Sequence, residues 1–139
     1  MQLNSYLTFK EGDCEAAMNF YKDILGGEFT TMMRFEDAPP DAFPVPDNAK
    51  KLVMHCTLEF GGCTLMGSDT INSDEISIGN NTSLSINATE EEAYAIFTGL
   101  AENGSILMPF EEVFWGGKFG IINDQFGIRW MVSSDHKPE

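Results

Sequence analysis

The chain carries two hairpins of similar pattern, and this repeat restricts the possible folds more than any other feature of the sequence. The first hairpin runs from His55 to Gly67 and turns at Gly61-Gly62. The second runs from Val113 to Val132 and turns at Asn123-Asp124-Gln125-Phe126-Gly127. In both, short apolar and polar runs flank turn-forming residues, which indicates two antiparallel strands. Because the pattern returns after about half of the chain, it indicates a duplicated module rather than a short-period solenoid.

The residues before the first hairpin predict a strand, a helix and a second strand. The first strand is expected from Leu3 to Phe9. Asp13 is expected to cap the helix, and Gly26-Gly27 to end it. Glu28 to Phe35 is expected to form the next strand. Residues 36–50 hold four of the six prolines, so they are predicted to form a loop.

The residues before the second hairpin follow the same order. A strand is predicted from Thr82 to Asn87. Thr89 is expected to cap a helix, with Glu92 completing a capping box. Asn103-Gly104 ends this helix, and Ser105 to Met108 forms the next strand.

Each half therefore follows a β-α-β-β-β order, which predicts an α+β fold made of two modules. A length of 139 residues suits one domain with a hydrophobic core. We expect a single domain over residues 1–139, with the first module over residues 1–68 and the second over residues 81–134.

Composition restricts the partners and the cellular location. Eight Lys and Arg against 22 Asp and Glu give a net charge of -14, which excludes the basic surface that nucleic acids require and disfavours acidic membranes. No apolar run approaches the roughly 20 residues that span a bilayer. Three cysteines, an odd number without a C-x-x-C motif, argue for a reducing compartment. The expected location is the cytoplasm.

Several short segments carry a family resemblance that spans nearly the whole chain. They are Tyr6-Leu7-Thr8-Phe9, Asn19-Phe20-Tyr21-Lys22, Val53-Met54-His55, Leu65-Met66-Gly67-Ser68-Asp69, Phe114-Trp115-Gly116, and Asp124-Gln125-Phe126-Gly127 with Trp130-Met131. The chain resembles the PhnB-like branch of the vicinal oxygen chelate superfamily, which includes glyoxalase I, extradiol dioxygenases and bleomycin-resistance proteins. The resemblance implies an open barrel with outer helices, a ligand in its concave interior, and a homodimer.

Proteins of this branch are often labelled 3-demethylubiquinone 3-methyltransferase-like, but methyl transfer is not expected here. A methyl-donating cosubstrate needs a nucleotide site, usually a Gly-rich turn between a strand and a helix. The turns after the first strand of each half, Lys10-Glu11-Gly12-Asp13 and Ala88-Thr89, lack such a motif.

Side-chain alternation along strands separates the residues that face the predicted pocket from those under the helices. If Gly61-Gly62 is a two-residue loop, Thr57 lies opposite Met66, and His55 lies opposite Ser68. The predicted lining consists of Tyr6, Thr8, His55, Thr57, Glu59, Met66, Ser83, Ser85, Arg129 and Met131, with Phe114 and Trp115 as one wall.

The resemblance also implies four metal-ligand positions, one on the first and last strand of each module. They fall near Tyr6, on Met66, at Asn81 or Ser83, and on Met131. Hard or borderline cations prefer carboxylate oxygen or imidazole nitrogen, which none of these residues offers. The sequence therefore predicts a pocket without a metal or another cofactor.

Three of the lining residues invite both a functional and a structural interpretation. His55 is a candidate general base or hydrogen-bond partner of a ligand, or a histidine bonded to Ser68 or to a backbone carbonyl. Arg129 holds an anionic group of a ligand, or pairs with one of the many carboxylates. Trp115 stacks on a planar ligand, or packs in the core or in a dimer interface.

The predicted function is binding of a small organic ligand in a concave pocket, without a metal, by a homodimer that binds neither nucleic acid nor membrane. The alternative is an enzyme, a lyase, isomerase or dioxygenase that uses His55 and a divalent metal. A third possibility is a dimeric interaction module without a ligand.

Overall fold

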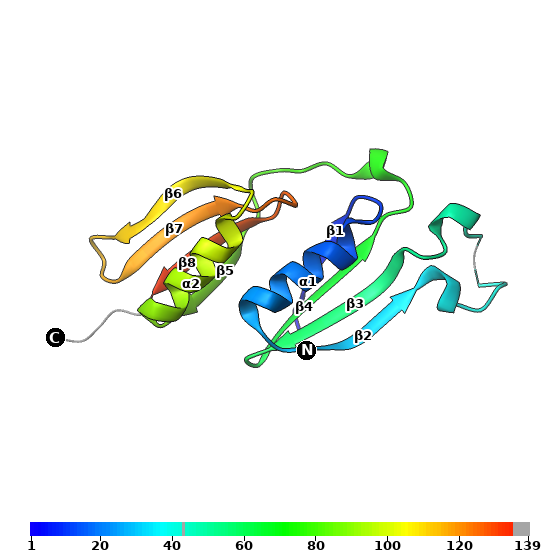
Figure 1. Ribbon diagram of the computed structural model, residues 1–139, viewed down its shortest axis with the longest axis horizontal. Coiled ribbons are helices and arrows are strands. Elements are labelled where there is room, and N and C mark those ends of the chain that lie inside the picture. Colours follow the sequence, from blue (N-terminus) through cyan, green and yellow to red (C-terminus); the bar gives the residue numbers. More distant parts are fainter. Residues whose placement is uncertain (43, 135–139) are drawn as a thin grey trace. The chain divides into compact units, whose positions relative to one another are not determined.

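The computed structural model describes residues 1–42 and 44–134 (Figure 1). The chain divides into two compact units, Met1–Ser77 and Ile78–Glu139. Each unit contains one four-stranded sheet and one α-helix. In the described residues, no helix is long and apolar enough to cross a membrane.

The first unit is a mixed sheet with one helix packed on it. Its elements are β1 (Ser5–Phe9), α1 (Asp13–Leu25), β2 (Glu28–Arg34), β3 (Val53–Phe60) and β4 (Cys63–Asp69), with short 3-10 helices η1 (Phe35–Asp37), η2 (Asp47–Ala49) and η3 (Ser73–Glu75). The strand order is β1-β4-β3-β2. Strands β1 and β4 are parallel, and the other neighbours are antiparallel.

The second unit repeats this arrangement. Its elements are β5 (Leu84–Ala88), α2 (Glu90–Ala101), β6 (Ser105–Glu112), β7 (Lys118–Asn123) and β8 (Arg129–Ser134). The strand order is β5-β8-β7-β6, again with only the first pair parallel. The predicted α+β class and the β-α-β-β-β order of each half are therefore confirmed.

Each helix buries one face of its sheet. In the first unit, Met18 and Tyr21 of α1 and Leu58 of β3 are completely buried. In the second unit, Phe97 of α2 packs over Gly120, where an added Cβ would lie 2.6 Å from the ring. A glycine at this position therefore lets the helix lie close to the strand. We call the other face of each sheet, which points away from the helix, the first and the second open face.

The hairpin register follows the prediction, whereas the start of α1 does not. Thr57 lies opposite Met66 across the Gly61-Gly62 turn, as expected. Asp13, however, does not cap α1. Gly12 occupies the cap position, and a glycine has no side chain that could bond the first N–H groups of the helix. The N–H of Cys14 instead donates to Oδ1 of Asp69, 2.9 Å away at the end of β4. A remote carboxylate thus performs the role that the sequence assigned to a local one.

The second helix is capped by Thr89 as predicted, but among the described residues the Glu92 side chain does not complete the predicted capping box. The strand after this helix is longer than predicted. Thr89 caps α2, since its Oγ1 accepts the N–H of Glu92 at 3.3 Å. Strand β6 continues to Glu112, beyond the expected end at Met108, and register shifts interrupt its pairing with β7. These shifts break the alternation from which the strand was predicted.

Candidate functional site

Three side chains on the first open face form a hydrogen-bonded cluster. The hydroxyl of Tyr6 lies 3.1 Å from Nδ1 of His55, and Oγ1 of Thr57 lies 3.0 Å from Nε2 of the same ring. The Tyr6 and His55 rings also stack, with centroids 5.6 Å apart and planes inclined by 24°. Both imidazole nitrogens therefore face a hydroxyl. Among the described residues, His55 bonds neither Ser68 nor a backbone carbonyl, the two structural partners expected from the sequence.

Strand pairing explains why these residues meet. Met66 on β4 lies opposite Tyr6 of β1 and opposite Thr57 of β3, so the three form one row across the sheet. Next to Met66, an added Cβ on Gly67 would lie 3.5 Å from the Cys14 sulfur of α1, which places Gly67 on the helix side. Met66 and its row therefore lie on the open face. Tyr6 is 47% exposed, whereas Thr57 is only 7% exposed, so the phenol is the accessible end of the cluster.

The first open face also contains residues that the sequence did not identify. Thr31 and Met33 of β2 lie opposite Thr57 and His55, respectively. A register shift between Phe29 and Thr31 offsets the alternation of this strand, so a simple period of two misses them. The predicted residues Thr8 and Glu59 share this face by alternation, in line with Tyr6 and Thr57.

The second open face holds the predicted residues of the second module. Met131 of β8 lies opposite Ser85 of β5, and Arg129 lies opposite Asn123 of β7. Ser83 directly precedes β5, so extending the register places it beside Arg129.

The two aromatic wall residues lie in the turn between β6 and β7. The Trp115 ring contacts Phe114 edge-on, with centroids 4.9 Å apart, and contacts Phe119 of β7 at 5.8 Å. Phe114 itself is almost fully exposed. Trp115 is therefore positioned at one end of the second open face, whereas Phe114 contacts its ring and stays exposed.

The positions that correspond to metal ligands do not offer suitable donors. In the first unit Tyr6 lies opposite Met66, and in the second unit Ser85 lies opposite Met131. Ser85 is therefore the counterpart of Tyr6, so the third ligand position falls on Ser85 and not on Asn81 or Ser83 as predicted. The donors are a phenol, an alcohol and two thioethers, which do not fit a hard cation. Within residues 1–42 and 44–134, no three His, Cys, Asp or Glu side chains gather as a metal-binding group.

The thiols show no sign of activation. Burial, with a smaller contribution from Glu15, raises the pKa of Cys56 to about 11. Burial also raises the pKa of Cys14, and the nearby Asp69 carboxylate adds to this effect. Cys63 is exposed, and all three cysteines are free. The two buried thiols therefore stay protonated at neutral pH and are poor nucleophiles.

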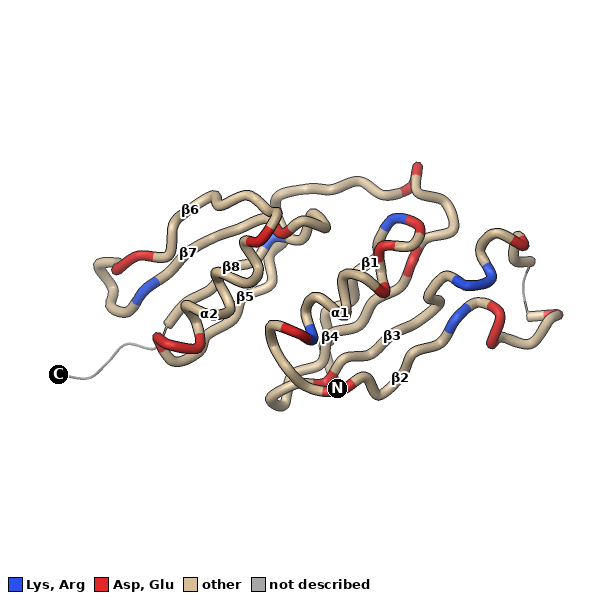
Figure 2. The backbone as a smooth tube through the Cα atoms, viewed as in Figure 1, with Lys and Arg blue, Asp and Glu red and all other residues tan. Residues whose placement is uncertain are grey.

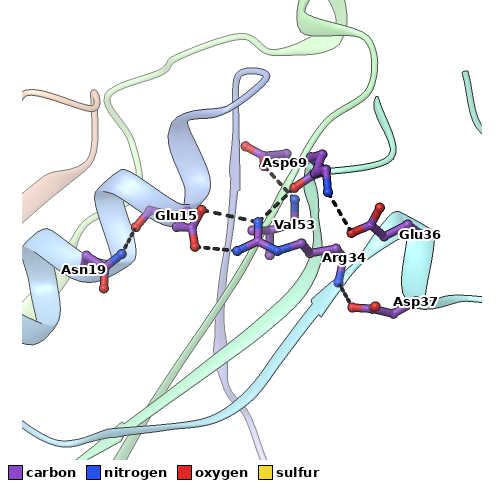
Figure 3. A network of polar contacts seen from close by, with 8 residues as sticks. Glu15, Asn19, Arg34, Glu36, Asp37, Val53 and Asp69 are labelled. Atoms are coloured by element: carbon purple, nitrogen blue, oxygen red, sulfur yellow. Dashed lines mark hydrogen bonds and ion pairs between the residues drawn. The ribbon is translucent and has the colours of Figure 1, made fainter. Parts of the chain in front are cut away.

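A second polar network fixes the loop after β2 to helix α1 (Figure 3). The guanidinium of Arg34 forms a two-pronged ion pair with Glu15, with contacts of 2.6 and 3.3 Å. It also donates to the backbone carbonyl of Lys51 at 2.9 Å, and the Arg34 N–H donates to the Asp37 carboxylate at 2.8 Å. The network closes the base of the proline-rich loop. Its contacts to Glu15 and Lys51 could not be predicted from the sequence, because these partners lie 19 and 17 residues from Arg34.

Family and sequence comparisons cover nearly the entire chain. The family model described as Glyoxalase/Bleomycin resistance protein/Dioxygenase superfamily matches residues 5–132. Protein YjdN from Escherichia coli (strain K12) is 32% identical over 143 residues, which cover 96% of this chain and 95% of YjdN.

Solved structures show the same similarity. Protein PA1353 from Pseudomonas aeruginosa matches with a TM-score of 0.83 and 35% identity, over 99% of both chains. A PhnB protein from Bacillus cereus, provisionally named a 3-demethylubiquinone-9 3-methyltransferase, matches with a TM-score of 0.80 and 28% identity, over 97% of this chain and 100% of that one. The fosfomycin resistance protein FosX from Listeria monocytogenes shares the fold at 12% identity and a TM-score of 0.66, over 97% and 93% of the two chains. The predicted PhnB-like resemblance is thereby confirmed.

Proposed function

This chain belongs to the glyoxalase/bleomycin resistance protein/dioxygenase superfamily, and we propose that it binds a small organic molecule on its open faces without a metal ion. The observation that carries this proposal is the cluster of Tyr6, His55 and Thr57 on the first open face. The cluster lies on the face of the sheet that the helix does not cover, next to Met66, which stands where relatives that use a metal place a ligand.

The chemistry of the cluster favours a ligand with a hydrogen-bonding group. The exposed Tyr6 hydroxyl can donate to a ligand oxygen or accept from a ligand N–H or O–H. Because Thr57 and Tyr6 occupy both nitrogens of His55, the imidazole is fixed in orientation and acts on a ligand through the phenol. The thioethers of Met66 and Met33 beside it offer adaptable apolar contact.

A second candidate function is an enzyme that moves a proton through the same cluster. The phenol of Tyr6 lies between solvent and His55. When Nδ1 of His55 is unprotonated, the phenol can give its own proton to that nitrogen while its oxygen takes one from a ligand, so the ring becomes imidazolium and the phenol stays neutral. A metal-assisted lyase, isomerase or dioxygenase that uses His55 needs the cation to displace one of the two hydroxyls from the ring. Methyl transfer receives no support, because the turns after β1 and β5 lack a nucleotide-binding motif.

A thermal-shift screen with a library of small organic molecules tests the proposal. We expect compounds that raise the Tm of the wild-type protein and lose this effect in Tyr6→Phe and His55→Gln. Tyr94→Phe, which removes the hydroxyl of an exposed tyrosine on α2, is the matched control and keeps the effect. Each variant is compared with its own ligand-free Tm, so a change in stability is separated from a change in binding.

Metal content and oligomeric state are measured on the same samples. A stoichiometric divalent metal that disappears in His55→Gln would overturn metal-free binding and favour the enzyme. A library without any binding compound would favour the interaction module. We also propose a homodimer, as in the family, which light scattering after size-exclusion chromatography tests.

A further inference from the structure

The second open face holds one basic side chain without a counter-ion in the described part of the chain. Over residues 78–134 the only Lys and Arg are Lys118 and Arg129 (Figure 2). Lys118 is paired, with its Nζ 2.8 Å from the carboxylate of Glu90. Arg129 is half-buried, and no carboxylate of the described residues pairs with it. The acidic residue nearest to it along the chain, Asp124, accepts hydrogen bonds from Trp130 and from two backbone amides instead.

Cross-strand pairing arranges this face in three rows, which lie about 7 Å apart because each step is two residues along a strand. Along the β7–β8 pair the rows run from polar and cationic, through apolar, to one that contains an aromatic ring: Arg129 with Asn123, Met131 with Ile121, and Ser133 with Phe119. On the neighbouring strand β5, Ser85 lies beside Met131 and Asn87 beside Ser133. The distance from the first row to the third is about 13 Å.

The aromatic end of the face is extended by Trp115. The turn that presents it is closed by hydrogen bonds between Val113 and Gly117 at 3.1 Å and between Val113 and Gly116 at 3.0 Å. The Trp115 ring is 59% exposed and rests on Phe119. Glu111 of β6 lies opposite Phe119, so a negative charge is disfavoured at this end.

We propose that the second open face binds an organic anion with an elongated aromatic body, with its carboxylate or a similar group on Arg129. This inference rests on the proposed function and specifies the ligand class. The aromatic body lies along Ile121 and Met131 toward Trp115.

Three physical reasons favour this ligand class. A guanidinium stays charged and binds carboxylates in a two-pronged geometry, which gives both affinity and orientation. A half-buried cation without a protein counter-ion gains more from an incoming anion than a fully hydrated one. Thioether, isoleucine and indole groups match an aromatic body rather than a sugar or a polar peptide.

Two probes of the same shape and different charge test this inference. Biphenyl-4-carboxylate carries one negative charge, whereas biphenyl-4-carboxamide is neutral. Binding of each to the full chain is measured by calorimetry and by tryptophan fluorescence, in which a bound probe is expected to change the emission of the exposed Trp115 and not that of the buried Trp130. We expect the carboxylate to bind about tenfold or more tightly than the amide, the scale of a charge-assisted hydrogen bond.

Two variants assign this preference. Arg129→Gln is expected to remove the preference for the carboxylate, and Lys10→Gln, which removes the same charge from an exposed site in the first unit, is expected to keep it. Equal affinity for the two probes, or a preference that survives Arg129→Gln, would overturn the inference and leave the proposed function standing. If neither probe binds while library compounds bind through Tyr6, the inference also fails alone. If nothing binds at all, the proposed function fails as well.

Self-association is a separate outcome of the same measurement. A tryptophan signal that changes with protein concentration and not with the probe would show that a second copy of the chain covers the face, which would also overturn the inference.

Discussion

The substitution Asp124→Asn tests how the second hairpin is held together. Asp124 is 4% exposed, and its carboxylate accepts hydrogen bonds from the turn and from strand β8. Oδ1 accepts the N–H of Phe126 at 2.8 Å and of Ile128 at 3.1 Å, and Oδ2 accepts Nε1–H of Trp130 at 2.8 Å. Asparagine can keep the first two bonds through its amide oxygen. Its NH2 group then faces the indole N–H, so two donors oppose each other.

The expected loss follows from this geometry. One charge-assisted hydrogen bond disappears and the buried indole N–H is left without an acceptor, so the free energy of unfolding should fall by about 2–3 kcal/mol. For a chain of this size such a loss lowers Tm by about 6–12 °C. Urea unfolding followed by circular dichroism measures the free energy, and Asp23→Asn at an exposed position of α1 is the control, with an expected change below about 0.5 kcal/mol.

A double-mutant cycle isolates the contact itself. In a Trp130→Phe background the indole donor is already absent, so Asp124→Asn should cost at least about 1 kcal/mol less than in the wild type. Equal costs in the two backgrounds would refute the assigned role of the Asp124–Trp130 bond, whatever the total loss of stability.

Three further predictions concern other parts of the fold. At pH 7.5, Ellman's reagent should modify Cys63 alone in the folded chain, with Cys14 and Cys56 reacting only after unfolding; rapid reaction of a second thiol in the folded state would contradict the assigned burial. Burial raises the pKa of Asp69, so the folded state keeps this proton at pH values where the unfolded state has lost it. The free energy of unfolding of the wild type relative to Asp69→Asn should therefore fall as pH rises from about 3.9, the ordinary aspartate pKa, through the raised value. If urea titrations give the same difference at every pH, the folded and unfolded states share one Asp69 pKa. Gly120→Ala should destabilise by about 1–3 kcal/mol, because its Cβ would overlap the α2 ring packed on this position, and an unchanged urea midpoint would show that the helix moves away freely.

The sequence predicted those parts of the structure that depend on local pattern. The Gly61-Gly62 turn has few geometries, so it determined the pairing of Thr57 with Met66, and alternation then assigned the remaining residues of the hairpin to a face. The cap of α2 could be predicted because Thr89 and Glu92 are only three residues apart. In each case the interacting groups lie close together in the chain.

The contacts that the sequence did not predict join distant segments. Tyr6 and His55 were both assigned to one face, but their contact depends on which strands are neighbours in the sheet, and they are 49 residues apart. The cap that Asp69 provides for α1 spans 55 residues. The faces of strand β2 could not be predicted for another reason, since a shifted register at Thr31 changes which side chains share a face. The alternation of side chains along a strand predicts which residues share a face, whereas the order of the strands in the sheet determines which of these residues are in contact.

The completeness of each unit has a consequence for how the chain could evolve. Each half has its own helix packed on its own sheet, so a substitution on one open face leaves the interior of both halves intact. After a duplication, selection could then change the two surfaces one at a time. One copy now displays an imidazole between two hydroxyls, and the other displays a guanidinium and an indole, on sheets that share one strand order.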